Sequence, residues 1–157
     1  MWLTPAPARL LSRDERESLT PVSMVEDGSH AVDPAHFGPC QAALIRRAAR
    51  FAEVARIFVN PGIKQALCAS AVGDRAWLGK VRPWYGHAEH LHVRLRCPSD
   101  QAGCRDQDPP SKGDGCEGDL QRWLDRAPYQ PKERSTPARP VALAELPTAC
   151  RDVLREP

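Results

Sequence analysis

The sequence has no apolar run long enough to cross a membrane, and its opening residues, MWLTPAPARLLSRDERE, lack the apolar core of a signal peptide. It also has no excess of one charge, because 22 Lys and Arg face 20 Asp and Glu and leave a net charge of +2. Binding to nucleic acid or to an anionic membrane surface therefore has no support in the composition. The patterns G-x-S-x-G, P-loop and H-E-x-x-H do not occur, which removes the common hydrolase and nucleotide-binding motifs.

Aromatic residues are few, whereas proline and glycine are abundant. The 157 residues include 3 Phe, 4 Trp and 2 Tyr but 16 Pro and 10 Gly, which predicts a loop-rich fold around one modest core. Seven of the prolines lie between Pro109 and Pro147, as in extended and poorly packed chain. We therefore expect one domain over residues 1–127 and a Pro-rich extension over residues 128–157 that ends in a short helix.

The 6 cysteines indicate an oxidising compartment. There is no C-x-x-C, and the gaps between Cys97, Cys104 and Cys116 are too long for a zinc knuckle, so disulfides are favoured over a cysteine metal site. The opening residues supply no export signal, however. This conflict leads us to expect that the start of the chain is incomplete.

Periodicity predicts several short elements. The clearest helical pattern covers residues 42–54, where apolar residues recur opposite arginines. A buried strand is expected over 56–60, leading into a loop at Asn60-Pro61-Gly62. Residues 1–32 show no helical period, and their turn EDGSH has Gly28 available for a positive φ. Further short helices are expected at 63–69, 74–80, 119–125 and 148–155.

Residues 90–97 (HLHVRLRC) alternate strictly between apolar and polar side chains and predict a strand. The side expected to face the core consists of Leu91, Val93, Leu95 and Cys97. The opposite side carries His90 and His92 on one surface, roughly 6 to 7 Å apart at about 3.3 Å of rise per residue.

Three of the 5 histidines, His87, His90 and His92, fall within the run GHAEHLHVRL. A single surface histidine commonly does no more than hydrogen-bond to its neighbours. Two imidazoles on one face of a strand, with a third just upstream, are a common way to hold zinc or to place a ligand beside a base. The cluster therefore favours a metal-binding or catalytic role.

Two neighbouring motifs each have two interpretations. Asp27 and His30 flank a glycine and could converge on one point, although a plain turn needs only the Asp and the Gly. Trp84 and Tyr85, just before the histidines, could be core aromatics or the wall of a substrate cleft. The residues alone leave both questions open.

Three segments carry a family resemblance: KVRPWYGHAEHLHVRLRCP at 80–98, RIFVNPGIKQALC at 56–68 and GDGC at 113–116. Together they resemble the penicillin-insensitive murein endopeptidases, periplasmic zinc peptidases related to lysostaphin-type enzymes, D-Ala-D-Ala peptidases and the hedgehog signalling domain. The resemblance implies a disulfide-stabilised, loop-rich α+β fold with a central antiparallel sheet flanked by helices. It also implies a zinc cofactor and cleavage of D-alanyl–meso-diaminopimelate cross-links in murein.

By position, the resemblance makes His92 a zinc ligand, His90 the catalytic histidine beside the metal and His87 a further active-site histidine. Asp27 and His30 match ligands of an additional metal position. Trp84 and Tyr85 would bind substrate. The implied disulfides are Cys97–Cys104 and Cys68–Cys116, and Cys40 and Cys150 either pair with each other or stay free.

One departure from the family pattern concerns the metal. The family's other zinc ligands, a His and an Asp, match positions upstream of Met1. We therefore expect the codon directly before Met1 to encode Asp, the codon seven residues further back to encode His, and a signal peptide to begin before both. Without those ligands the chain could instead be a non-catalytic peptidoglycan-binding module or a structural secreted domain.

Overall fold

The computed structural model describes residues 1–128 and 142–153. The predicted Pro-rich extension lies largely outside these residues, since 129–141 and 154–157 are not described. Its predicted terminal helix is present as α5 (Thr148–Val153), preceded by the short 3-10 helix η2 (Leu143–Glu145). Within the described part of the chain, no helix has the length and apolar character needed to cross a bilayer.

A three-stranded sheet stands at the centre of the fold, in the order β2-β1-β3. The middle strand β1 (Val54–Val59) pairs in parallel with β2 (Val81–Pro83) and antiparallel with β3 (His92–Leu95). The chain between β1 and β2 is helical and returns to the start of the sheet, and such a crossover makes neighbouring strands parallel. The predicted α+β class is confirmed, with a mixed sheet where an antiparallel one was expected.

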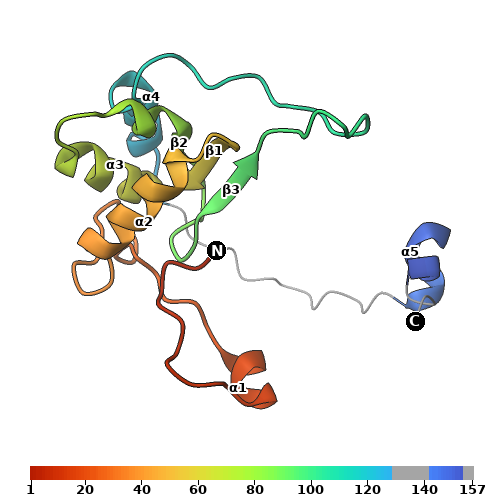
Figure 1. Ribbon diagram of the computed structural model, residues 1–157. Helices are drawn as coiled ribbons and strands as arrows, with labels where there is room; N and C mark the ends of the chain where they lie inside the picture. Colours follow the sequence, from red (N-terminus) through yellow and green to blue (C-terminus); the bar gives the residue numbers. More distant parts are fainter. Residues whose placement is uncertain (129–141, 154–157) are drawn as a thin grey trace.

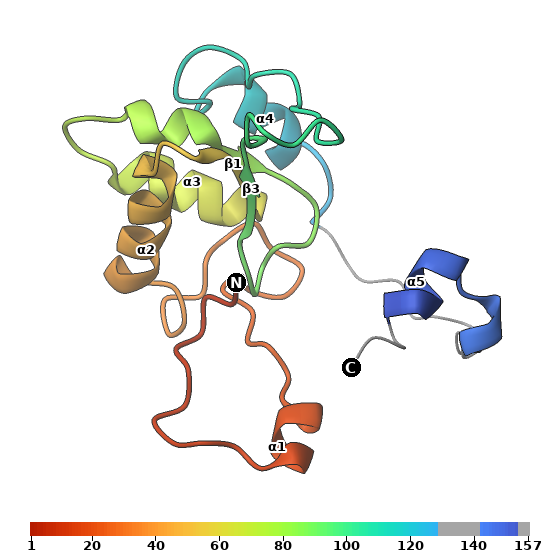
Figure 2. The same cartoon turned by 45° about the vertical axis from the view of Figure 1, so that its right-hand side comes forward.

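Helices cover one face of this sheet. They are α2 (Pro39–Arg50), α3 (Pro61–Ser70) and the 3-10 helix η1 (Ala76–Lys80), and α2 and α3 lie on the same side of the strands in both views (Figures 1 and 2). The residues that share this core include Ile45, Ala49, Ile57, Val59, Ile63, Leu67, Leu78, Val81 and Leu91. This rigid layer fixes where the ends of the strands, and the loops that follow them, lie.

The opposite face of the sheet is polar and cationic. Cross-strand pairing places Arg82 beside Phe58, Phe58 beside His92, and Arg56 beside Arg94, so these side chains project from the same face. We call these five residues the arginine face. The loop 105–111 arches over it, because Arg56, Arg82 and Arg94 each donate to a residue of that loop.

Strand β3 is shorter than predicted and only part of its apolar side is buried. Leu91 is fully buried, but Leu95 is 59% exposed, so its assignment to the core was wrong. The pairing shifts between Val54 and Arg56, where two residues of β1 face one step of β3. Such a bulge disturbs the alternation of side chains, which accounts for the outward position of Leu95 at the end of the sheet.

The N-terminal residues extend the sheet beside β3. Met1 and Leu91 exchange main-chain hydrogen bonds of 2.9 and 3.0 Å, and Trp2 forms an antiparallel bridge with His90. The chain then leaves the sheet and forms helix α1 (Arg13–Ser18), which stands apart from the other helices (Figure 1). No helix was predicted here, although Ser12 and Glu15 form a capping box that the spacing S-x-x-E could have indicated.

Two disulfides are present, and they are the two that the family resemblance implies. Cys97–Cys104 closes the loop after β3, and Cys68–Cys116 joins α3 to the loop before α4 (Gly118–Leu124). Cys40 and Cys150 are exposed and unpaired in the described part of the chain. The two bridges therefore bracket the loop that covers the arginine face.

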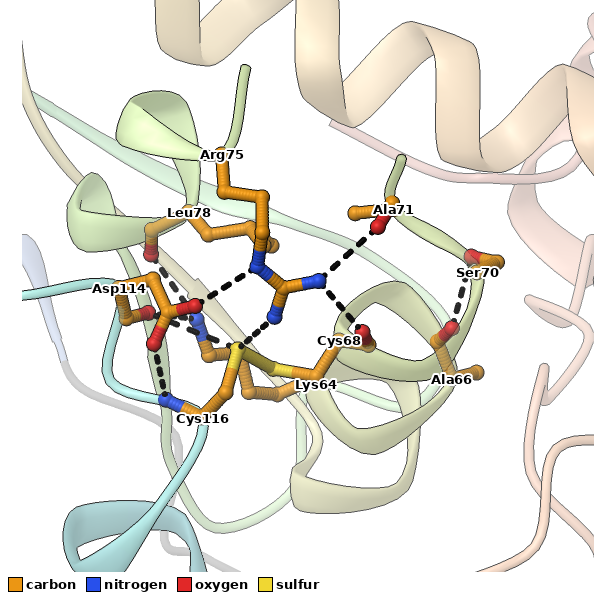
Figure 3. The surroundings of a disulfide bond; sticks show 9 residues. All are labelled: Lys64, Ala66, Cys68, Ser70, Ala71, Arg75, Leu78, Asp114 and Cys116. Atoms are coloured by element: carbon orange, nitrogen blue, oxygen red, sulfur yellow. Dashed lines mark hydrogen bonds and ion pairs between the residues drawn. A yellow bond between two sulfur atoms is a disulfide. The ribbon is translucent and has the colours of Figure 1, made fainter. Parts of the chain in front are cut away.

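A polar cluster surrounds the Cys68–Cys116 bridge (Figure 3). The Lys64 ammonium, fully buried, donates to the main-chain oxygens of Leu78 at 2.9 Å and Asp114 at 2.6 Å. Arg75 donates to the carboxylate of Asp114 and to the carbonyl of Cys68. These bonds attach the loop before α4 to α3 independently of the disulfide.

Candidate active site

The three clustered histidines lie on and after the loop between β2 and β3. Gly86 and His87 both have positive φ angles, 62° and 53°, so the chain reverses tightly just before His90 and His92. The His87 ring is 4.9 Å from the His90 ring and 5.9 Å from the His92 ring, centroid to centroid. The His87 ring thus packs against both of the other imidazoles.

Local contacts determine the tautomer of His87 and the protonation of His90. His87 Nδ1 is 2.7 Å from the carbonyl oxygen of Tyr85. A carbonyl can only accept, so Nδ1 carries the proton and Nε2 keeps its lone pair in the neutral ring. Burial, followed by repulsion from His87, lowers the pKa of His90 below its usual value, against the opposing effect of Glu89. His90 is therefore held in its neutral form near pH 7.

The predicted turn at Asp27 to His30 meets this loop. Gly28 has the expected positive φ of 67°. Asp27 and His30 line a pocket of about 440 Å³ together with His87 and His90. His30 Nε2 lies 2.8 Å from the carbonyl oxygen of Arg126 and donates to it, which leaves Nδ1 as the acceptor.

Asn60, which follows β1, holds these separate segments together. Its main-chain N–H donates to the carbonyl of His87 at 3.0 Å and its side-chain amide to that of Gly86 at 3.1 Å. Its side-chain oxygen accepts from Gly62 N–H at 2.9 Å and caps α3. Gly62 in turn approaches the His30 carbonyl so closely that a Cβ there would lie 2.2 Å from the oxygen. The sequence pattern predicted only a loop at Asn60 and Gly62.

Aromatic side chains form one wall beside the histidines. Trp84 and Tyr85 are 50% and 41% exposed, which excludes a core role for them. Trp123 of α4 contacts both rings, with centroids 5.6 and 4.8 Å away, and the Arg126 guanidinium lies 5.0 Å from its centroid. Trp123 was not among the predicted site residues, although a Trp on the predicted helix at 119–125 was a signal for it.

The predicted site residues are thus brought near one another, but in two groups. Asp27, His30, His87 and His90 line the pocket, whereas His92 is not part of its lining and has its ring 5.5 Å from that of Phe58. Within residues 1–128 and 142–153, no three His, Cys, Asp or Glu side chains converge in a way that could hold a metal ion. The donors are of the right type for zinc, but they do not complete a site by themselves.

Comparison with known proteins gives the class. The model of the family described as penicillin-insensitive murein endopeptidase matches residues 1–155, and the chain belongs to this family of metallopeptidases.

Among curated proteins, the chain is 48% identical over 133 residues to the penicillin-insensitive murein endopeptidase of Klebsiella pneumoniae subsp. pneumoniae, covering 85% of this chain and 47% of the relative. The protein of the same name from Yersinia enterocolitica is 43% identical over 154 residues, which cover 98% of this chain and 54% of the relative. The chain spans about half the length of the curated relatives it matches.

Proposed function

We propose that this chain is the histidine-bearing portion of a zinc-dependent endopeptidase that cleaves D-alanyl–meso-diaminopimelate cross-links in murein. The observation that carries the proposal is the packing of His87 against His90 and His92, at ring distances of 4.9 and 5.9 Å, within a chain of this family. Cross-linked murein lies outside the cytoplasm, and we place the protein in the periplasm.

Each histidine has a role that suits its surroundings. His92, the most exposed of the three, is the proposed zinc ligand, and Asp27 and His30 are proposed ligands of an additional metal position. Zinc, when bound, would polarise the scissile carbonyl and lower the pKa of a bound water. His90, neutral near pH 7, can accept a proton from the attacking water. His87, whose ring lies 4.9 Å from that of His90, is the proposed further active-site histidine.

The strand register supports the assignment of His92. Met1 pairs with Leu91 and Trp2 with His90, so a residue joined to the Met1 nitrogen would lie directly opposite His92. Cross-strand neighbours project from the same face with Cβ atoms about 5 Å apart. An Asp at that position, as the family pattern has it, would reach the same point in space as the His92 imidazole.

Trp84 and Tyr85 are the proposed substrate-binding residues, and their exposed faces beside His87 and His90 suit that role. We assign these residues to a domain over 1–127 and treat 128–157 as an extension outside the catalytic unit.

Digestion of murein tests the proposal. The chain is joined at Met1 to the preceding half of the Klebsiella relative and incubated with purified sacculi, and the muropeptides are separated by chromatography. Loss of cross-linked dimers that is prevented by a chelator and restored by zinc is the expected result. Unchanged dimers from a folded, zinc-loaded chimera would overturn the proposal.

A second function is favoured by one observation. The exposed rings of Trp84 and Tyr85 would also suit a module that binds murein peptides without cleaving them. Retention of the isolated chain on sacculi, combined with an inactive chimera, would favour this alternative.

A further inference from the structure

A second groove, of about 620 Å³, lies on the arginine face next to the histidines. Its floor includes Arg56, Phe58 and Arg82, and its walls are the loop 106–111 and the rings of Trp84 and Trp123. Phe58 contacts Trp84 on one side and His92 on the other, each with ring centroids 5.5 Å apart. A chain lying across the histidines would therefore continue over Phe58 into this groove.

The charges in the groove are unequally satisfied. Arg82 and Arg122 both bind the Asp119 carboxylate, and the Asp106 carboxylate accepts from the main-chain N–H of Cys97 at 2.9 Å. These groups neutralise one another or are held by the main chain. Arg56 is the remaining cation of the groove, and its partners determine whether the groove can bind an anion.

Among the residues that the structure describes, Arg56 is hydrogen-bonded only to neutral groups. Its guanidinium donates to the main-chain oxygen of Asp108 at 2.7 Å and to the side-chain oxygen of Gln107 at 3.4 Å, and it lies 5.8 Å from the Phe58 ring centroid. Asp108 is also a lining residue of the groove, yet among the described residues no carboxylate forms an ion pair with Arg56. Arg94 is the cross-strand neighbour of Arg56 on β3, although it does not line the groove itself.

We propose that this groove binds a free carboxylate of the peptide substrate, with Arg56 as its anchor. The inference rests on the proposed function, because it places the carboxylate on the peptide whose bond reaches the histidines. Murein stem peptides carry free carboxylates on their glutamate and diaminopimelate residues and at their C-terminal D-alanine. A guanidinium on a rigid strand matches a carboxylate with two parallel N–H donors, and the Trp rings cover the aliphatic parts of the peptide.

Binding of a soluble muropeptide dimer tests this. The full chain is titrated calorimetrically with the dimer and with the same dimer after conversion of its free carboxyl groups to primary amides. The acid form is expected to bind about 10- to 100-fold more tightly than the amide, as expected for charge-assisted hydrogen bonds. The variant Arg56→Gln should lose this preference, and Arg56→Lys should keep part of it because it retains the charge.

Arg47→Gln is the matched control, since it removes the same charge from an exposed position on α2, on the other side of the sheet. It should bind both dimers as the parent chain does. If Arg56 only holds the loop above it, Arg56→Gln will weaken both forms equally and the preference will remain, which overturns the proposal. Binding of neither form by the parent chain also overturns it, while digestion of sacculi by the chimera decides the proposed function separately.

Discussion

The buried ammonium of Lys64 makes the stability of the fold depend on pH. Lys64 lies on α3 with no exposed surface, and burial lowers its pKa from 10.5 to about 7, with added repulsion from Arg82 and Arg75. The charge of Asp114 opposes the shift, as do the hydrogen bonds that Lys64 donates to the carbonyls of Leu78 and Asp114. Near neutral pH the folded protein thus holds this proton far less tightly than the unfolded chain does.

The sign of the effect follows from the proton count. Between pH 7 and 10.5 the unfolded chain keeps the Lys64 proton and the folded chain has lost it, so the free energy of unfolding rises with pH. The slope rises to at most about 1.4 kcal/mol per pH unit, and because Lys64 is half titrated at pH 7 the total from pH 7 to pH 9 is about 2.3 kcal/mol. Below the folded pKa both states are charged, and the contribution is flat.

Urea unfolding of the parent chain and of Lys64→Met, measured from pH 6 to pH 9 with the disulfides intact, checks this. The difference in unfolding free energy between the two proteins should shift steadily in favour of the parent chain above pH 7. Loss of the two hydrogen bonds changes the offset between the curves and leaves the slope alone. Lys112→Met, at an exposed position, should show no such slope. A constant difference for Lys64→Met would refute the reasoning, because it would mean that Lys64 stays charged in the fold.

Three further sets of substitutions test the histidines, a disulfide and the packing at Gly62. In the chimera, His92→Ala should lose zinc as measured by metal analysis, whereas His90→Ala should keep zinc and lose turnover by about 100- to 10,000-fold; equal zinc loss would make both residues ligands. Replacing Cys97 and Cys104 with Ala removes the disulfide that closes the smaller loop, with a sequence separation of 7, and should lower the unfolding free energy by about 2.5 kcal/mol. An unchanged urea midpoint would contradict this. Gly62→Ala should cost about 1 to 3 kcal/mol because its Cβ would meet the His30 carbonyl, whereas Gly103→Ala, with open space around it, should leave the melting temperature unchanged.

Local sequence patterns were sufficient to predict an element whose conformation depends mainly on its own residues. The helix predicted at 42–54 is present as α2, which begins at Pro39, whose fixed φ suits the first helical position. Its predicted end was wrong, because the helix stops at Arg50 and Val54 already belongs to β1. The pairing of the strands was not accessible in the same way. The parallel alignment of β1 and β2 depends on the path of the intervening helices, and the outward turn of Leu95 depends on a bulge formed with another strand. Both depend on contacts between distant segments, which the alternation of apolar and polar residues along one strand does not predict.

The candidate site shows the same division between local and long-range information. The clustering of His87, His90 and His92 is visible in a run of ten residues, but their meeting with the turn at Asp27 to His30 is not. That meeting requires the close approach of Gly62 to the His30 carbonyl. Gly62 does not have a positive φ, so the missing side chain serves packing between segments and not a turn. A glycine of this kind has no local signature, and only its neighbours in the fold reveal why no larger residue fits there.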